Sequence, residues 1–403
     1  MTETRPEAVR MPMTRAPGCP FDPPDGLATL RADNPITRME YPDGHVGWLV
    51  TGYALTREVL ADPRFSSKRE LLRVPFPGGP VGTMPPAPPG HLHGMDPPEH
   101  TRYRRLLAGR FTVRRMDQLT ERIERSTAEH LDAMVRQGPP ADLVECCAYP
   151  VPALTICELL GVPAADHDRF KRTARMMNAL DNDPAEAYAA ATSLDAYMRE
   201  LVAVKRAHPT DDLLGDLTET DLTEEELVGI GTVLLGAGLD TTANMIALGV
   251  LALLSHPDQF AALRDDPAQV DGAVEELLRY LTVVHTNVQT ALVDVELGGQ
   301  SIRAGDSVTF SMHAANRDPA RFTDPDTLDV RRRAVGHLAF GHGIHQCLGQ
   351  QLARVEMRVA FRALLTRFPT LRLAAPLAEI PVHVTAIYSA PRIPVTWDAD
   401  GDG

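Results

Sequence analysis

The segment from Phe340 to Arg354, FGHGIHQCLGQQLAR, combines residue types that can stabilise a thiolate beside a flat ligand. Its one cysteine, Cys347, lies in a glycine-rich loop that runs directly into an amphipathic helix. Gly341 and Gly343 permit backbone conformations that a side chain would forbid, and they leave room for a planar molecule. The residues after the cysteine open the helix, so their free N–H groups and the helix dipole would stabilise a thiolate. A cysteine outside such a pattern is usually a small buried hydrophobe.

A second group, an acid followed by an alcohol, lies inside a long apolar segment. Thr223 and Glu226 form a capping-box signature, which predicts the start of a helix. From Leu227 to Ser255, Asp240 is the only charged residue, and Thr241 follows it directly. An acid beside a hydroxyl can relay a proton and hold a water molecule by hydrogen bonds.

The same segment raises two structural questions. At roughly 1.5 Å per residue it spans about 43 Å, which is long enough to cross a bilayer. Acidic residues on both flanks and the polar cluster around Asp240 instead favour the central helix of a large soluble protein. Gly236 and Gly238 weaken the helix just before the hydroxyls of Thr241 and Thr242, which compete for backbone carbonyls. We therefore expect a local bulge there, which would make room for a small molecule and water.

The third motif is Glu276-Leu277-Leu278-Arg279, about 70 residues before Cys347. Its acid and its arginine are three residues apart and share one helix face, so they can form a buried bidentate ion pair. A structural role is expected for this pair.

Together the three motifs resemble the cytochrome P450 family. Around Cys347, the residue types Phe, Gly, His, Cys, Gly, Ala and Arg fall at the spacing of that family's haem-binding loop. The hexapeptide AGLDTT, residues 237–242, is similar to its oxygen-activation motif, and Glu276 with Arg279 matches its E-x-x-R pair. The resemblance covers nearly the whole chain, from about Pro35 to Trp397.

The resemblance implies haem b, iron protoporphyrin IX, as the cofactor, with Cys347 as the thiolate ligand and therefore the metal-binding residue. It assigns His100, Arg104 and His345 to the haem propionates, whose negative charges need such donors. The cofactor-binding residues that it implies are His100, Arg104, Phe340, Gly341, His345, Cys347 and Gly349.

The resemblance also assigns catalytic roles: Asp240 would relay protons from solvent, and Thr241 would hold oxygen and water by hydrogen bonds. One position departs from the family pattern. Where the family commonly carries an arginine that binds a propionate, this chain has Gln289. We expect that propionate to be held less electrostatically, or by another group.

Substrate contacts are expected from the long apolar helix and from three further regions. The stretch 73–90, RVPFPGGPVGTMPPAPPG, is too rich in proline and glycine for regular structure, and long loops in compact folds are usually functional lids. By resemblance it covers the substrate. Residues 281–288 are expected to form a loop that passes the haem edge, and strands at 382–388 and 393–397 a hairpin whose tip touches substrate. The expected contacts are Val233, Ala237, Val284, His285, Thr286, Asn287 and Ile387.

Composition narrows the class of partner and compartment. The formal net charge of −14 over 403 residues argues against nucleic acid as a partner and against a polybasic membrane anchor. The first residues contain no apolar run typical of a signal peptide. The five cysteines have neither disulfide-like nor metal-like spacing, which favours a reduced, cytoplasmic protein. We expect a monomer that does not associate with a membrane.

The expected fold is mostly α with a small, mainly antiparallel β region. By resemblance this is the cytochrome P450 fold, with haem between the long central helix and the helix after Cys347. Residues 1–25 are interpreted as a mobile or surface-bound N-terminal arm, and 26–403 as a single catalytic domain. Alternating residues predict hairpins at 36–50 and 291–302 and a buried strand at 308–310.

The function expected from the resemblance is a soluble bacterial monooxygenase that hydroxylates or epoxidises a small organic molecule. Actinobacterial enzymes of this kind tailor secondary metabolites such as macrolides, other polyketides or peptides, including antibiotics. Two alternatives stay open: a haem-thiolate enzyme that desaturates or couples rings, and a non-catalytic haem-binding protein. A sensor needs no proton relay, so Asp240 and Thr241 argue against the second.

Electrons would come from a separate ferredoxin and ferredoxin reductase, because no flavin or nicotinamide motif follows a strand. Arg354, Arg358 and Arg362 are spaced by four residues after Cys347 and form a basic stripe. Arg358 and Arg362 are the expected docking residues for an acidic ferredoxin. Arg354 is expected to be internal.

Overall fold

Helix α9 (Glu224–Ser255) begins and ends as its sequence predicts. The hydroxyl of Thr223 accepts a hydrogen bond from the Glu226 N–H at 3.2 Å, and the Glu226 carboxylate accepts one from the Thr223 N–H at 2.7 Å. This capping box satisfies two N–H groups that would otherwise lack partners. The helix stops before Pro257, which begins the next one.

Helix α9 is also the centre of the largest hydrophobic core. Among the residues that the structure describes, it is the one helix long and apolar enough to cross a membrane, yet 72% of its most apolar window is buried inside the protein. A helix that is apolar on all sides and covered by other helices is typical of the core of a soluble protein.

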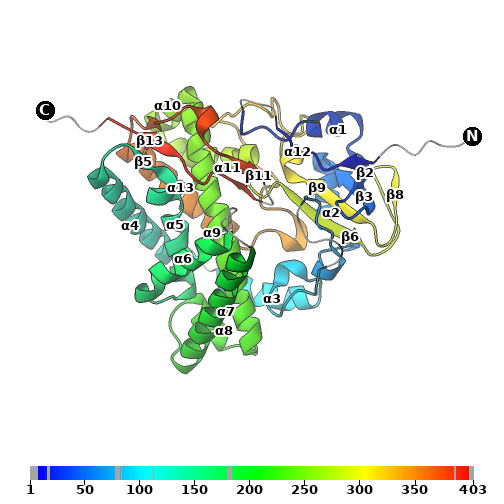
Figure 1. The fold of residues 1–403 in the computed structure, drawn as a ribbon, viewed down its shortest axis with the longest axis horizontal. Helices are drawn as coiled ribbons and strands as arrows, with labels where there is room; N and C mark the ends of the chain where they lie inside the picture. Colours follow the sequence, from blue (N-terminus) through cyan, green and yellow to red (C-terminus); the bar gives the residue numbers. More distant parts are fainter. Residues whose placement is uncertain are drawn as a thin grey trace, which may run out of the picture.

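Many of the other helices gather around α9, whereas α1, α2 and α12 lie beside the larger sheet (Figure 1). The structure is a computed structural model, and it describes residues 8–15, 19–77, 82, 84–111, 113–178, 184–384 and 387–398. The helices are α1 (Leu27–Asp33), α2 (Tyr53–Ala61), α3 (Glu99–Ala108), α4 (Val113–Gln137), α5 (Pro150–Leu160), α6 (His167–Asn178), α7 (Pro184–Ala207), α8 (Leu213–Thr218), α10 (Pro257–Asp265), α11 (Val270–Leu281), α12 (Met312–Asn316) and α13 (Gln350–Arg367). Helices α5, α7, α11 and α13 all pack against α9.

The strands form one larger sheet and three small ones. Figure 1 shows the larger sheet on one side of α9, opposite helices α4, α5 and α6. Its strand order is β1-β2-β3-β9-β6-β4. The strands are β1 (Val9–Arg10), β2 (Ile36–Glu40), β3 (Val46–Val50), β4 (Phe65–Ser66), β5 (Ala141–Asp142), β6 (Thr286–Ala291), β7 (Val295–Leu297), β8 (Gln300–Ile302), β9 (Ser307–Ser311), β10 (Arg372–Leu373), β11 (His383–Val384), β12 (Tyr388–Ser389) and β13 (Pro394–Thr396). The predicted hairpins β2–β3 and β7–β8 and the buried strand β9 are confirmed.

The described part of the N-terminal arm is bound to the rest of the fold. Strand β1 pairs in parallel with β2, so that Val9 lies opposite Met39. The guanidinium of Arg15 lies 3.5 Å from the ring centre of Tyr388. Phe21 is buried in the main core. Residues 1–7 and 16–18 of the arm lie outside the described residues, and its boundary at residue 25 stays a prediction.

Three predictions about local structure need correction. No bulge interrupts α9, which is α-helical through residues 236–242. The loop expected over 281–288 is shorter, because β6 begins at Thr286 and pairs with β9. The expected C-terminal hairpin has different partners: β11 pairs with β12, whereas β13 pairs with β10 and β5. Strands of two or three residues carry too little pattern to fix their partners, which tertiary packing selects.

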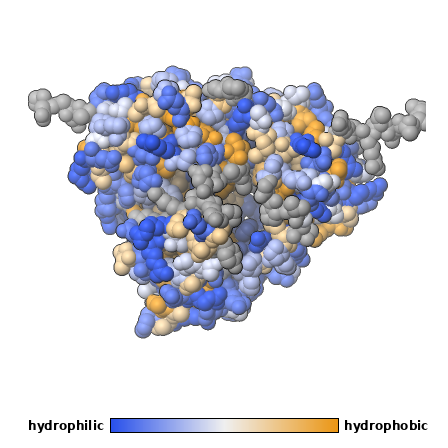
Figure 2. Space-filling model, in the orientation of Figure 1, coloured by the Kyte–Doolittle hydropathy of each residue, from blue (hydrophilic) through white to orange (hydrophobic). Residues whose placement is uncertain are grey.

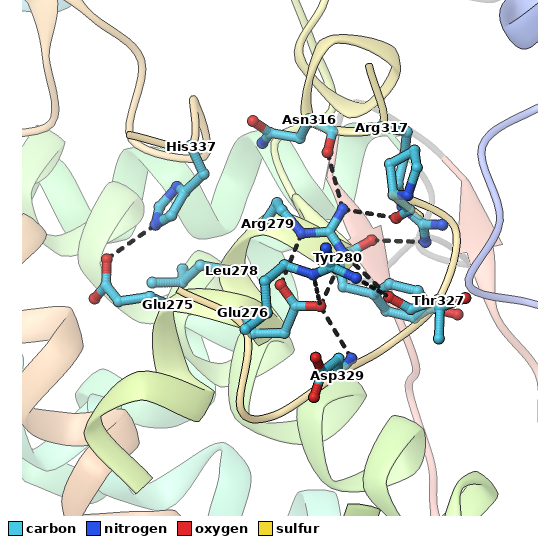
Figure 3. Close-up of polar contacts among 12 residues, drawn as sticks. Glu275, Glu276, Leu278, Arg279, Tyr280, Asn316, Arg317, Thr327, Asp329 and His337 are labelled. Atoms are coloured by element: carbon cyan, nitrogen blue, oxygen red, sulfur yellow. Dashed lines mark hydrogen bonds and ion pairs between the residues drawn. The ribbon is translucent and has the colours of Figure 1, made fainter. Parts of the chain in front are cut away.

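The Glu276–Arg279 pair is fully buried, as predicted (Figure 3). Arg279 donates two hydrogen bonds to the Glu276 carboxylate, at 2.7 and 2.8 Å. Its guanidinium also donates to the carbonyl oxygens of Asn316 at 2.9 Å, Pro325 at 2.7 Å and Thr327 at 3.3 Å. The arginine on α11 therefore fixes the irregular chain that leads to the Cys347 loop.

Candidate active site

The loop before Cys347 depends on two glycines with positive φ. Gly341 has φ 68° and Gly343 has φ 73°, in the left-handed region that disfavours other residues. A Cβ added to Gly343 would lie 2.2 Å from the carbonyl oxygen of Leu60 on α2. The Cys347 N–H closes the loop by donating to the Phe340 carbonyl at 2.9 Å. The glycines thus set the path that presents the cysteine, as the sequence predicts.

Cys347 is the exposed one among the chain's five free cysteines. Protein nevertheless surrounds the thiol closely enough for burial to raise its pKa. Three groups oppose that effect and favour the thiolate: the backbone N–H of Gly349 and the guanidinium groups of Arg104 and Arg354. Gly349 is the N-cap of α13, which begins at Gln350. The predicted stabilisation of a thiolate by the helix start is therefore present, but burial outweighs it.

A cluster of basic side chains lies beside the thiol. The rings of His100 on α3 and His345 in the Cys347 loop are 4.3 Å apart between centroids. Burial and the neighbouring His100 lower the pKa of His345 to about 4. Burial and Arg104 lower the pKa of His100 as well. We call His100, Arg104 and His345 the cationic edge; the structure brings these three predicted residues together.

The donors of the cationic edge fit an anionic group. His100 is 2% exposed, and neither of its ring nitrogens has a hydrogen-bond partner among the described residues. Arg104 is half-buried, and the described part of the chain supplies it with no ion-pair partner. Buried donors without acceptors are costly. The two carboxylates of haem would supply acceptors for these donors and a counter-charge for Arg104, so the residues fit that cofactor.

One face of α9 carries three of the predicted residues. Val233, Ala237 and Thr241 are four residues apart and therefore share a face. Val233 and Thr241 are half-buried and Ala237 is exposed, in the middle of a helix that is otherwise mostly buried. This stretch is thus not covered by protein as the rest of α9 is. The Thr241 hydroxyl donates to the Ala237 carbonyl at 2.7 Å.

Asp240 lies at the edge of that face and has a partner that sequence reasoning missed. The Asn244 side-chain amide donates to the Asp240 carboxylate at 3.3 Å and to its backbone carbonyl at 2.9 Å. Burial raises the pKa of Asp240, and the hydrogen bond from Asn244 opposes the rise only partly. The i, i+4 spacing of the two residues was the available signal. The carboxyl group is held in place and is easier to protonate than an exposed aspartate.

The other expected substrate contacts divide into two groups. Val284 and Ile387 are half-buried, and the Tyr388 N–H donates to the Val283 carbonyl at 2.9 Å, so the two segments adjoin. Asn287 is exposed. His285 and Thr286 are buried at 3% and 6% exposure and are hydrogen-bonded to each other at 2.8 Å. Their role as substrate contacts stays a prediction. Residues 78–81 and 83 of the expected lid and 385–386 of the C-terminal tip lie outside the described residues.

Phe340 and Arg354 belong to a further group that supports the loop. The Arg354 guanidinium lies 4.5 Å from the ring centre of Phe340 and donates to Glu275 at 2.6 and 3.0 Å. His337 reaches the same carboxylate at 3.1 Å. Although burial raises the pKa of Glu275, these two partners lower it to about 2. Arg354 is internal, as expected; no sequence signal pointed to Glu275 or His337.

Comparisons with known proteins identify the family. The family model for Cytochrome P450 matches residues 195–373. Cytochrome P450 105C1 from a Streptomyces species is 50% identical over 381 residues, which cover 94% of this chain and 96% of the relative. The chain belongs to the cytochrome P450 family. Pentalenic acid synthase from Streptomyces avermitilis is 45% identical over 392 residues, which cover 94% of this chain and 95% of that P450.

Solved P450 structures confirm the predicted fold. The structure of CYP105P1 in complex with filipin I has a TM-score of 0.90 and 43% identity, and covers 98% of this chain and 100% of its own. Streptomyces peucetius CYP105P2 with a biphenyl compound has a TM-score of 0.90 and 44% identity, with 97% and 99% covered. As a bacterial P450, the chain is an oxidoreductase of a monooxygenase family whose cofactor is haem iron.

A buried acid on α13 was also missed by sequence reasoning. Glu356 is 3% exposed. Burial raises its pKa to about 8, and the hydroxyl of Thr155 on α5 opposes the rise only partly. The carboxyl group is therefore protonated near neutral pH, where it can lie between α13 and its neighbours without a cation.

This acid predicts that stability falls as the pH rises. The folded-state pKa of about 8 lies above the ordinary 4.5, so the unfolded state releases the proton first. Between these values the unfolding free energy should fall by roughly 1.4 kcal/mol per pH unit from this group. In urea unfolding, the free energy of unfolding of Glu356→Gln should fall less from pH 5 to 8 than that of the wild type. The control Glu121→Gln, which changes an exposed acid, should lose as much as the wild type. Parallel pH curves for Glu356→Gln and the wild type would contradict this assignment.

Proposed function

We propose that this P450 is a haem-thiolate monooxygenase that hydroxylates or epoxidises a small secondary metabolite with dioxygen and electrons from a separate ferredoxin. The observation that carries the proposal is the cationic edge, with its unpartnered donors, beside the Cys347 thiol. The exposed face of α9, which carries Thr241, supports it further. Haem b is the proposed cofactor, with Cys347 as its thiolate ligand.

The proposed substrate class is a macrolide, another polyketide or a peptide. Its support is the relatives: CYP105P1 has been crystallised with filipin I, and one relative is named pentalenic acid synthase. Figure 2 shows a mainly hydrophilic surface with small hydrophobic patches, which suits a soluble protein. We propose that the protein works in the cytoplasm as a monomer, consistent with five free cysteines and a net charge of −14.

The residues of the chain divide the work as follows. When bound, haem iron supplies the activation of dioxygen. Cys347 would provide a thiolate, which the Gly349 N–H favours. Asp240, held by Asn244 and with a raised pKa, would pass a proton inward. Because the Thr241 hydroxyl donates its own proton to the Ala237 carbonyl, its oxygen is left to accept a hydrogen bond from a water.

The proton route predicts the behaviour of two variants with a substrate. Spectral titration against a panel of macrolides, polyketides and peptides would first identify a molecule that displaces the iron-bound water. With that molecule and a surrogate ferredoxin system, Thr241→Ala should keep binding and haem content, while hydrogen peroxide replaces most of the product. Asp240→Asn should mainly slow turnover.

Two neighbouring changes serve as controls for this experiment. Thr241→Ser keeps the hydroxyl and should keep the product yield. Thr242→Ala removes the hydroxyl of a residue that is only 4% exposed and should also keep the yield. A fully coupled Thr241→Ala enzyme would show that this hydroxyl does not hold the water.

We propose that ferredoxin docks near Arg358 and Arg362 on α13. Both guanidinium groups are partly exposed and border a groove of about 690 Å³ between α4 and α13. Asp271 pairs with both, at 3.5 Å to Arg358 and 3.3 Å to Arg362. This shared acid reduces the positive charge that the stripe presents, which the sequence did not predict.

The pairing gives the docking proposal a two-sided test. Arg358→Glu and Arg362→Glu should raise the ferredoxin concentration for half-maximal reduction, while Asp271→Asn should lower it. All effects should shrink at high salt, since exposed charges are screened within about 8–10 Å. Stopped-flow reduction at two ionic strengths measures this. If reduction responds neither to the reversals nor to Asp271→Asn, the docking surface lies elsewhere.

A further inference from the structure

Gln289 is uncharged, whereas the cytochrome P450 family commonly carries an arginine at this position. Its side chain is buried on β6, and its amide nitrogen donates to the Ser67 hydroxyl at 3.0 Å. Its carbonyl oxygen is buried and has no partner among the described residues. The amide is therefore tied to the chain after β4. A haem propionate beside Gln289 would therefore need a cation from another residue.

Arg69 follows Ser67 by two residues and is half-buried at the start of a short 3-10 helix (Arg69–Leu71). In the described part of the chain, no carboxylate or carbonyl accepts a hydrogen bond from its guanidinium. In this respect Arg69 resembles Arg104 of the cationic edge.

The backbone places Arg69 on the side of the cationic edge. Arg69 packs against the segment Leu92–Gly94, since a Cβ added to Gly94 would lie 3.3 Å from the Arg69 Cβ. That segment leads into α3, which carries His100 and Arg104. The Ser67 N–H donates to the Asp96 carboxylate at 2.9 Å, which holds the chain before Arg69 against the residues just before α3. His93, in the same segment, lies close enough to Arg69 that the guanidinium adds to burial in lowering the pKa of His93.

We propose that Arg69 binds a haem propionate in this P450 and supplies the charge that Gln289 lacks. The inference rests on the haem site proposed above. A guanidinium is suited to the role because its fixed fork of donors matches a carboxylate. Filling the cationic edge with carboxylates would give the Arg69 charge the partner that the protein does not provide.

Arg69→Gln should therefore release haem faster. We expect transfer of haem from the holoenzyme to apomyoglobin, followed by Soret absorbance, to accelerate about tenfold, the effect of losing one charge-assisted hydrogen bond. Arg105→Gln, which removes an exposed charge from α3, should leave the rate unchanged. Arg69→Lys keeps the charge, so its rate of haem loss should lie between those of the wild type and Arg69→Gln.

A second cofactor separates propionate binding from a structural role. Reconstitution with haem dimethyl ester, whose propionates carry no charge, should abolish the difference between Arg69→Gln and the wild type. Gln289→Arg should slow haem loss in the Arg69→Gln protein. A rate for Arg69→Gln within about twofold of wild type, or an acceleration that persists with the dimethyl ester, would overturn the proposal. The reduced carbon monoxide complex of Arg69→Gln should still show thiolate ligation. Failure of the Arg69 proposal is therefore distinguishable from failure of the Cys347 assignment.

Discussion

Replacing Arg279 with methionine should lower the unfolding free energy by about 3–5 kcal/mol, the usual effect of removing one member of a buried ion pair. Both side chains of the Glu276–Arg279 pair have 0% exposure. Without Arg279, the partners of the buried Glu276 carboxylate among the described residues are Arg332, at 3.0 Å, and the Asp329 N–H, at 3.1 Å. The carbonyls that Arg279 binds in residues 316, 325 and 327 lose a donor as well.

Since domains are stable by only about 5–15 kcal/mol, much of the Arg279→Met protein should be unfolded or insoluble. Urea unfolding followed by circular dichroism measures the loss. The matched control is Arg303→Met, which removes an exposed pair with Asp294 at 2.7 Å and should leave the unfolding free energy nearly unchanged. Arg279→Lys, which keeps the charge but loses the bidentate geometry, provides a milder variant. Equal stability of Arg279→Met and Arg303→Met would contradict the structural role of the pair.

Features that depend on neighbouring residues were predictable from the sequence. The start of α9 follows from Thr223 and Glu226, which are three residues apart and interact within one helical turn. The Glu276–Arg279 pair is local in the same sense. Glycine at 341 and 343 predicted unusual backbone conformations because few other residues adopt positive φ.

Features that depend on distant partners were not predictable. Arg332 pairs with Glu276 across 56 residues, and Arg354 pairs with Glu275 across 79. The pairing of Arg358 and Arg362 with Asp271 on α11 is of the same kind, and it changes the charge of the proposed docking surface. A single sequence contains spacing but no tertiary distances.

The expected bulge in α9 was wrong for an instructive reason. The hydroxyl of Thr241 and the amide of Asn244 do bond to backbone carbonyls one turn earlier, as competition for those carbonyls predicts. A carbonyl has two lone pairs, however, so it can accept a side-chain donor while the helical hydrogen bond persists. The sequence indicated where side chains bond to backbone carbonyls, but not whether the helical backbone changes its conformation.

The central claim is that Cys347 supplies the thiolate ligand of haem iron. Helix α13, the N–H of Gly349 and two guanidinium groups favour a thiolate at this position, while burial alone raises the thiol pKa. A bound metal ion would overcome that burial cost, because a coordinating thiol is deprotonated outright. Replacing Cys347 should therefore have the largest effect of any single change on the cofactor.

The most direct measurement is the absorption spectrum of the dithionite-reduced protein with carbon monoxide. The wild type should show the red-shifted Soret band of thiolate ligation, and Cys347→Ser should lose it. Cys157→Ser, which changes a buried cysteine on α5, should keep it. A thiolate-type band in Cys347→Ser that matches the wild type would contradict the assignment of Cys347 as the iron ligand.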